Sequence, residues 1–334
     1  MFHFPYNRNG GAVSLSTFSG YPRGWFVVAF SDEIPVAQAT PMRYFGQDLV
    51  AFRGEDGQVR VLEAYCAHMG ASLAHGGKIE GCTIRCPFHG WRYDGSGACV
   101  EIPYAKKIPP KAHQRSWPVQ ERNGVVMIHH DPAGNAPDFE IPVLAEYGTA
   151  EWLPWACSRY QIKTHPREIV DNLADRAHFA FVHNTAIDEF SFEVDGHTAT
   201  QHTRGRAFLA SGGVDNFSSS TTYHGPGYLL MRMAGALQNY MLLAHTPIDE
   251  NNLDLRMAVT IKVVGGNREK TEGYTRLYLD NLKKGFEDDI KIWENKIYRE
   301  PALLCDGDGP IGRLRKWYRQ FYVEHVPVSA LPVD

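Results

Sequence analysis

The sequence is poor in three features that would each define a class of protein. It has only six cysteines in 334 residues, too few for a disulfide scaffold. It has no run near the roughly 20 apolar residues of a membrane span, and Met1 to Gly20 lacks the basic-then-apolar pattern of a signal peptide. A net charge of −4 gives the chain no overall positive charge with which to neutralise nucleic-acid phosphates. We therefore expect a cytoplasmic protein that neither crosses a membrane nor binds nucleic acid.

The first third of the chain predicts a small antiparallel β domain. From Trp25 to Pro132 it consists of short β runs separated by Gly, Pro and Asp turns. The segment Asp131 to Pro142 holds three prolines and one glycine, which is typical of a linker. We predict one domain over residues 22–135 and a second over residues 140–330.

The second domain is predicted to be α+β, with an antiparallel sheet flanked by helices. Helical patterns cover Pro166 to His183 and Tyr274 to Tyr298. Strand-like stretches lie between them, at Tyr228 to Met233, Tyr240 to His245 and Leu253 to Val264. With 43% hydrophobic residues, the chain is able to build a core in each domain.

Two thiolates and two imidazoles form the first candidate metal site. Cys66-Ala-His68 is followed after seventeen residues by Cys86-Pro-Phe-His89. The set suits either structural zinc or a [2Fe-2S] cluster in which two histidines replace two cysteines on one iron. Glycines just after each pair would let backbone N–H groups approach the cluster sulfurs and tune the reduction potential.

A second candidate site lies in the predicted helix after Pro166. Asp175 and His178 are three residues apart and would share a helix face, and His183 follows five residues later. Two imidazoles and a carboxylate can form a facial triad that leaves open positions on Fe(II) for O2. A lone His-x4-His pair is weak evidence, but its combination with the first site is specific.

Together the two motifs resemble the Rieske non-haem iron oxygenases over nearly the whole chain, from Trp25 to Glu324. The resemblance implies an N-terminal all-β Rieske domain and a catalytic domain of helix-grip, START-like fold. Cys66 and Cys86 would hold one iron of the cluster, and His68 and His89 the other. His178 and His183 would hold a mononuclear Fe(II).

The family takes its third iron ligand from a late helix, where an Asp precedes a Trp by four residues. Asp289 before Trp293 fits this pattern best, with Asp288 as the alternative. In related enzymes the aspartate matching Asp175 bridges a cluster histidine of one subunit and an iron histidine of the next, which implies a homotrimer. Asn172 is a candidate for contact with the iron.

The C-terminal part, which includes Ile292-Trp-Glu-Asn-Lys296 and Leu314-Arg-Lys-Trp-Tyr318, resembles the 3-ketosteroid 9α-hydroxylase oxygenases and the Rieske cholesterol 7-desaturases. That resemblance implies O2-dependent hydroxylation of an apolar, steroid-like substrate, with electrons from NAD(P)H through a flavin or iron–sulfur reductase or a ferredoxin. Desaturation of a sterol and oxygenation of a non-steroid aromatic stay open. Several aromatic and sulfur side chains are candidates for lining an apolar cavity: Phe190, Phe208, Tyr223, Tyr228, Met231, Met233 and Tyr240.

Two non-enzyme interpretations compete, a Rieske electron carrier and a zinc-stabilised binding protein. Neither needs the second site, and a bare carrier would end near residue 130. The stretch with Lys106, Lys107 and Lys111 suggests either a surface for an acidic electron donor or a solvated loop.

Overall fold

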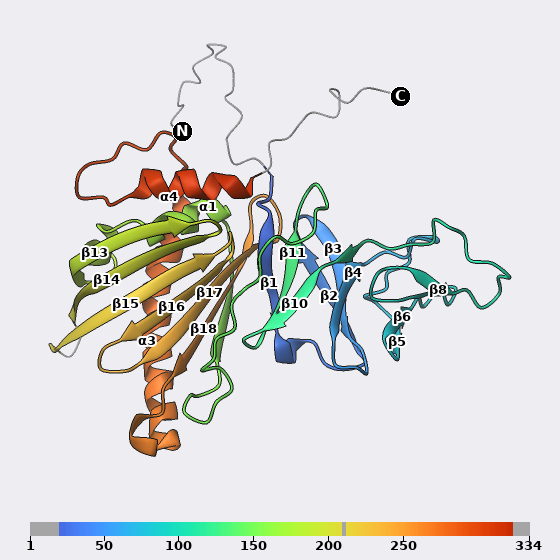
Figure 1. The fold of residues 1–334 in the computed structure, drawn as a ribbon, viewed down its shortest axis with the longest axis horizontal. Coiled ribbons are helices and arrows are strands. Elements are labelled where there is room, and N and C mark those ends of the chain that lie inside the picture. Colours follow the sequence, from blue (N-terminus) through green and yellow to red (C-terminus); the bar gives the residue numbers. More distant parts are fainter. Residues whose placement is uncertain (1–19, 209–211, 323–334) are drawn as a thin grey trace, which may run out of the picture.

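The computed structural model describes residues 20–208 and 212–322, which form four antiparallel sheets and a few helices (Figure 1). Three of the sheets belong to the N-terminal part. In spatial order they are β1 (Gly24–Phe30), β11 (Val125–His130) and β10 (Val119–Arg122); β2 (Ala39–Tyr44), β3 (Gln47–Arg53), β4 (Val59–Glu63) and β9 (Ser116–Trp117); and β5 (Lys78–Glu80), β6 (Thr83–Arg85), β7 (Arg92–Tyr93) and β8 (Cys99–Glu101).

The fourth sheet has seven strands and forms the C-terminal part. Its order is β12 (Ala156–Ile162), β18 (Leu253–Ile261), β17 (Asn239–Pro247), β16 (Tyr228–Ala234), β15 (Val214–His224), β14 (Thr198–Phe208) and β13 (Thr185–Asp195). The α-helices are α1 (Pro166–Val170), α2 (His178–Phe181), α3 (Arg268–Asn295) and α4 (Ile311–Tyr318). The 3-10 helices are η1 (Ser31–Glu33), η2 (Asp171–Leu173), η3 (Val264–Gly266) and η4 (Arg319–Phe321).

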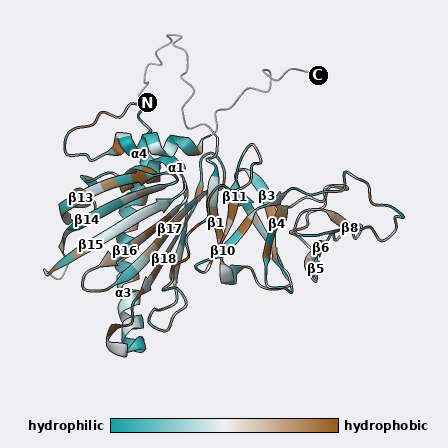
Figure 2. Ribbon diagram, viewed as in Figure 1, coloured by the Kyte–Doolittle hydropathy of each residue, from teal (hydrophilic) through white to brown (hydrophobic). Residues whose placement is uncertain are grey.

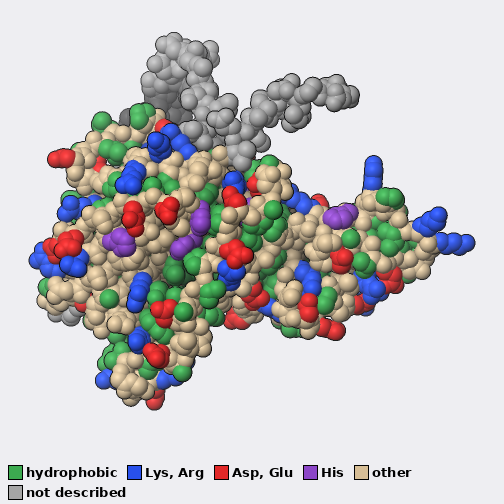
Figure 3. Space-filling view, in the orientation of Figure 1, with side chains coloured by type: hydrophobic (Ala, Val, Ile, Leu, Met, Phe, Trp, Pro, Cys, Tyr) green, Lys and Arg blue, Asp and Glu red, His purple; other side chains and the backbone are tan. Residues whose placement is uncertain are grey.

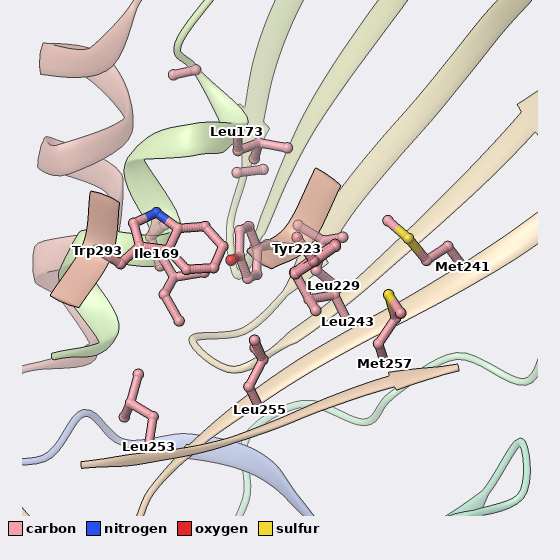
Figure 4. Packing of buried hydrophobic residues seen from close by; sticks show 14 of the residues in the cluster. Ile169, Leu173, Tyr223, Leu229, Met241, Leu243, Leu253, Leu255, Met257 and Trp293 are labelled. Atoms are coloured by element: carbon pink, nitrogen blue, oxygen red, sulfur yellow. The ribbon is translucent and has the colours of Figure 1, made fainter. Parts of the chain in front are cut away.

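The centre of the large sheet is buried on both faces. Every residue of β17 and β18 is buried, and the side chains alternate between two cores. Leu243 and Met257 face α3 in one core, with Trp293 (Figure 4). Leu242 and Ala258 face β1 and β11 in the other. Figure 2 shows β17 and β18 largely in brown, whereas β14 carries more teal.

A buried polar network also joins the N-terminal part to the large sheet. The Asp254 carboxylate on β18 accepts hydrogen bonds from the Tyr44 hydroxyl (2.5 Å), Arg159 Nε (2.6 Å) and Arg256 Nε (3.1 Å). Arg256 Nη2 in turn donates to the Val28 carbonyl of β1 at 3.0 Å. Because buried charges are tolerated only when they are paired, this network fixes how the two parts sit against each other.

The segment predicted as a linker is packed against its neighbours. The indole Nε1 of Trp25 donates to the Phe139 carbonyl at 2.7 Å, and Asn123 Nδ2 donates to the Pro142 carbonyl at 2.9 Å. The segment is thus tied to the β sheet that precedes it. The domain boundary near residue 140 stays a prediction.

The long helix was predicted in the right place but begins six residues earlier than expected, at Arg268 instead of Tyr274. The continuous helix predicted from Pro166 to His183 was wrong. That stretch is α1, then η2, then four residues without helix, then the short α2. The sequence reading also missed β13 to β15. Within the described ranges, no helix is long and apolar enough to cross a membrane.

Candidate metal sites

The two cysteine–histidine motifs form two loops of the same shape, one after β4 and one after β6. In the first loop, the Cys66 N–H donates to the Ala71 carbonyl (2.9 Å) and the Gly70 N–H donates to the Cys66 carbonyl (2.9 Å). The loop at Cys86 closes in the same way, and its Gly90 N–H donates to the Cys86 carbonyl at 3.2 Å. Gly70 and Gly90 have φ of 74° and 71°, which favours glycine. Each loop therefore presents its Cys and His in the same arrangement.

The four side chains of these loops come together at one end of the molecule. Cys66 and Cys86 are both buried, at 3% exposure, and the rings of His68 and His89 lie 4.7 Å apart. Burial raises the pKa of the Cys86 thiol, an effect offset in part by the backbone N–H groups of Phe88 and His89, which donate to its sulfur. His89 Nδ1 is buried without a hydrogen-bond partner in the described structure. Two buried thiols and an unpaired imidazole nitrogen fit a shared metal cluster.

Tyr93 and Trp91 hold this site from one side, and the motif spacing did not predict their roles. Trp91 directly precedes β7 and Tyr93 ends it, and both side chains are buried in the same cluster as Cys66 and Cys86. The buried Tyr93 hydroxyl lies 3.2 Å from Cys66 Sγ, and the Trp91 ring stacks on His68 with centroids 4.5 Å apart. Such contacts orient ligands and tune a metal centre.

The second site joins residues more than a hundred positions apart. Asp289 on α3 is buried, and its Oδ2 lies 3.3 Å from His183 Nε2. The rings of His178 and His183 lie 5.2 Å apart. Asp288, the alternative, instead faces solvent and pairs with Lys291 at 3.0 Å. The structure thus brings the predicted Asp289 to the two histidines and leaves Asp288 outside.

Asn172 connects the carboxylate to its helix. Its Nδ2 donates to Asp289 Oδ1 at 3.4 Å, and its Oδ1 accepts from Trp293 Nε1 at 3.3 Å. The amide is thus oriented by Trp293 and in turn orients Asp289. Within residues 20–208 and 212–322, no three His, Cys, Asp or Glu side chains converge as closely as a bound ion requires. The fit of a metal to each site therefore rests on the pairwise contacts described above.

Asp175 does not share a helix face with His178, because it lies just before α2 and caps it. Its Oδ1 accepts from the backbone N–H groups of Ala177 (2.9 Å) and His178 (3.2 Å). His178 Nδ1 donates to the Asp175 carbonyl at 2.8 Å, which leaves Nε2 as the nitrogen free to bind a metal. Burial acts to raise the pKa of Asp175, but these bonds with His178 and Ala177 hold it below its usual value.

Asp171, the first residue of η2, pairs with α4. Arg315 donates to both of its carboxylate oxygens, at 3.0 and 2.6 Å, and Lys296 Nζ lies 4.0 Å away. Asp171 is buried and directly precedes Asn172 in the chain. The pair therefore fixes the segment that supports the second site.

The aromatic and sulfur side chains predicted to line one cavity are divided between the two faces of the sheet. Tyr223 and Met231 belong to the core under α3. Tyr228 and Tyr240 pack in cores on the opposite face, so these side chains do not line one common cavity. A cavity of about 490 Å³ does lie over β13 to β16, but none of its lining comes from α3 or from the metal-site residues. We therefore do not regard it as the substrate site.

Comparison with known proteins agrees with this geometry. Residues 24–118 match the model of the Rieske [2Fe-2S] domain, and residues 128–322 match that of the 3-ketosteroid 9alpha-hydroxylase C-terminal domain. The chain is therefore an oxidoreductase of the Rieske non-haem iron oxygenase class. It belongs to the family of 3-ketosteroid 9α-hydroxylase oxygenase components within that class. Such a component carries a [2Fe-2S] cluster and a mononuclear iron and receives electrons from a separate reductase.

Several relatives are similar over most of their length. The chain is 38% identical over 320 residues to a 3-ketosteroid-9-alpha-monooxygenase oxygenase component of Rhodococcus rhodochrous, covering 91% of this chain and 82% of the relative. It is 34% identical to the protein of that name from Mycobacterium tuberculosis, covering 94% and 85%. A cholesterol 7-desaturase of Ciona intestinalis is 29% identical, covering 92% and 70%.

The fold comparison points the same way. A crystal structure of dicamba monooxygenase bound to dicamba superposes with a TM-score of 0.73 at 21% identity, covering 89% of this chain and 96% of that one. These findings confirm the predicted fold class, family and oxygenase function, and they exclude a bare electron carrier or zinc protein.

Proposed function

We propose that this chain hydroxylates a 3-ketosteroid at an unactivated carbon. The observation that carries the proposal is the 3.3 Å contact of the buried Asp289 with His183, whose ring lies 5.2 Å from that of His178. In this proposal these three side chains hold the mononuclear iron, while Cys66, His68, Cys86 and His89 hold the cluster. When bound, the cluster supplies single electrons and the iron activates O2.

The protein's own contribution at the second site is positioning. Trp293 orients the Asn172 amide, and that amide orients Asp289. The Asp175 carbonyl fixes the ring of His178. Rigid ligands supported in this way keep the open positions of the site in one place, which lets a bound substrate present one carbon to the reactive centre.

The proposed substrate space lies between the large sheet and α3. Leu243, Met241 and Met257 are buried in the core on this face of the sheet (Figure 4), and Met231 packs against the same core. Methionine side chains are flexible and polarisable, so they suit a bulky, rigid polycycle and exclude water from it. Substrate selection by this surface is part of the proposal, as is the 3-ketosteroid itself, the substrate named for the relatives.

We also propose a homotrimer. The strands that flank the cluster loops, β4 to β6, lie on one side of β1, and α3, which carries Asp289, lies on the other (Figure 1), so one chain does not bring its own two sites together. Both sides expose apolar side chains: Met69 (66%) and Phe88 (60%) beside the cluster, and Phe181 (90%) on α2. A head-to-tail contact would bury these surfaces against each other, and it forms a three-membered ring when successive subunits are rotated by a third of a turn. In that ring Asp175 would link His178 to His89 of the next subunit.

The test compares Asp289→Ala with its matched neighbour Asp288→Ala. We expect D289A to retain the cluster's electron paramagnetic resonance signal but to lose mononuclear iron and steroid-dependent O2 consumption. D288A should keep both, because Asp288 faces solvent. The proposed iron ligand set would be wrong if D289A kept a full complement of iron, or if D288A lost it.

The products of the wild-type enzyme decide the reaction type. We expect a panel of 3-ketosteroids to gain one oxygen atom by mass spectrometry. Loss of a hydrogen pair from a sterol instead would assign desaturation, the reaction named for the more distant relative.

Six free cysteines in the described structure are consistent with a reducing compartment, which supports a cytoplasmic location.

A further inference from the structure

The loop between β8 and β9 concentrates positive charge in an acidic chain. Residues 102–120 contain three lysines, one arginine and no acid, whereas the whole chain has a net charge of −4. Lys106, Lys107 and Lys111 are all exposed. None of the three forms an ion pair with any residue in the described ranges 20–208 and 212–322. Blue side chains project from this end of the molecule in Figure 3.

Nearby acids do not cancel this charge. Glu80 and Glu101, the carboxylates of β5 and β8, are paired with arginines on β6 and β7. Arg85 Nε lies 2.7 Å from Glu80, and Arg92 Nη2 lies 2.8 Å from Glu101. The lysines therefore determine the local potential that an approaching protein meets.

The loop is held in shape at both ends. Ile102 and Ala112 are buried, and the Cys99 N–H donates to the Ala112 carbonyl at 3.0 Å. Prolines at 103, 109 and 110 restrict the backbone between these anchors. A preformed loop loses little conformational entropy on binding, so its charges are available for association.

The same loop is connected to the cluster site through two aromatic side chains, its own Tyr104 and Trp91 beside the cluster. Tyr104 is 63% exposed, and its hydroxyl accepts from Trp91 Nε1 at 2.9 Å. Trp91 stacks on His68 at 4.5 Å, with ring planes 7° apart. An unbroken line of contacts therefore runs from a cluster ligand to the exposed surface.

We propose that Tyr104, Lys106, Lys107 and Lys111 form the docking surface for an acidic iron–sulfur electron donor, and that electrons enter along Tyr104, Trp91 and His68. This inference rests on the proposed function, since it needs a cluster at His68. Each transfer oxidises the donor by one electron and reduces the cluster by one, and no bond is made or broken.

The test measures cluster reduction by a reduced plant-type [2Fe-2S] ferredoxin, an acidic donor, in a stopped-flow experiment at several ionic strengths. For the wild type, the second-order rate constant should fall as salt rises. In K106Q/K107Q/K111Q it should be about 10-fold lower at low salt and nearly independent of salt. The matched control K163Q/K270Q/K316Q removes the same charge from exposed lysines of the catalytic part and should behave as the wild type.

A second comparison tests the path. Tyr104→Phe removes the hydroxyl that accepts from Trp91, and Tyr104→Ala removes the ring as well, so Y104F should slow transfer once the donor is saturating and Y104A should slow it further. The cluster signal in electron paramagnetic resonance should be unchanged in every variant, which separates slow entry from a damaged site.

Two results would overturn the inference. Wild-type rates and salt dependence in the loop variant, with a full cluster, would reject this docking surface and leave the proposed function standing. A wild-type chain that binds no iron–sulfur cluster would reject the proposed function and the surface with it.

Discussion

Replacing Asp171 by alanine should destabilise the protein strongly and loosen the second metal site. The carboxylate is buried and receives two hydrogen bonds from the Arg315 guanidinium, whose side chain is only 15% exposed. D171A would leave that cation half-buried beside Lys296 without its main partner. Breaking such a pair costs about 3–5 kcal/mol. A loss of that size corresponds to a fall in Tm on the order of 10 °C.

The assay is thermal unfolding of four proteins: wild type, D171A, Arg315→Met and the double variant. R315M also loses the stacking of Arg315 on Tyr298, whose ring centroid lies 4.5 Å away, so it should be destabilised as well. The double variant should be more stable than the sum of the single effects predicts, by roughly 2 kcal/mol. Single variants that each unfold within about 1 kcal/mol of the wild type would refute the reasoning, because a surface pair behaves in that way.

Three further predictions concern pH, the cluster and the core. Burial lowers the pKa of His165 and His245 to about 3. As the pH falls below about 6.5, these two side chains are therefore protonated in the unfolded chain but not in the folded one, which favours unfolding. Each histidine should lower the free energy of unfolding by about 2 kcal/mol at pH 5. Denaturant midpoints that stay constant from pH 7 to 5 would contradict this. Tyr93→Phe should leave the cluster bound but lower its reduction potential, measured by redox titration, because the hydroxyl beside Cys66 Sγ is lost. Leu243→Ala should cost about 2–5 kcal/mol in urea unfolding, and a smaller loss would show that the core collapses around the gap.

The parts of the two sites that lie close in sequence were predictable. Cys66-x-His68 and Cys86-x-x-His89 depend on spacing within single loops, and the structure brings the four together. Asp289 was selected because it stands four residues before Trp293. Its contact with Asn172 follows from how α3 packs against η2, which no local pattern encodes.

The errors have physical causes of the same kind. The helix predicted from Pro166 to His183 is interrupted because the Asp175 side chain bonds to the backbone ahead of it and caps a new helix start. Strand β15 contains Ser218, Ser219 and Ser220, so its sequence shows little hydrophobic alternation even though its burial alternates from Ser219 to His224. Pairing with β14 and β16 in the sheet stabilises this strand although its sequence pattern alone does not predict it.

The central claim is that one chain holds both a Rieske cluster and a mononuclear iron. The most direct test is iron and acid-labile sulfide analysis of anaerobically purified protein, with electron paramagnetic resonance after dithionite reduction. The account predicts about three irons and two sulfides per chain and a Rieske-type signal. Zinc without sulfide, or two irons with no iron lost on replacing Asp289, would contradict it.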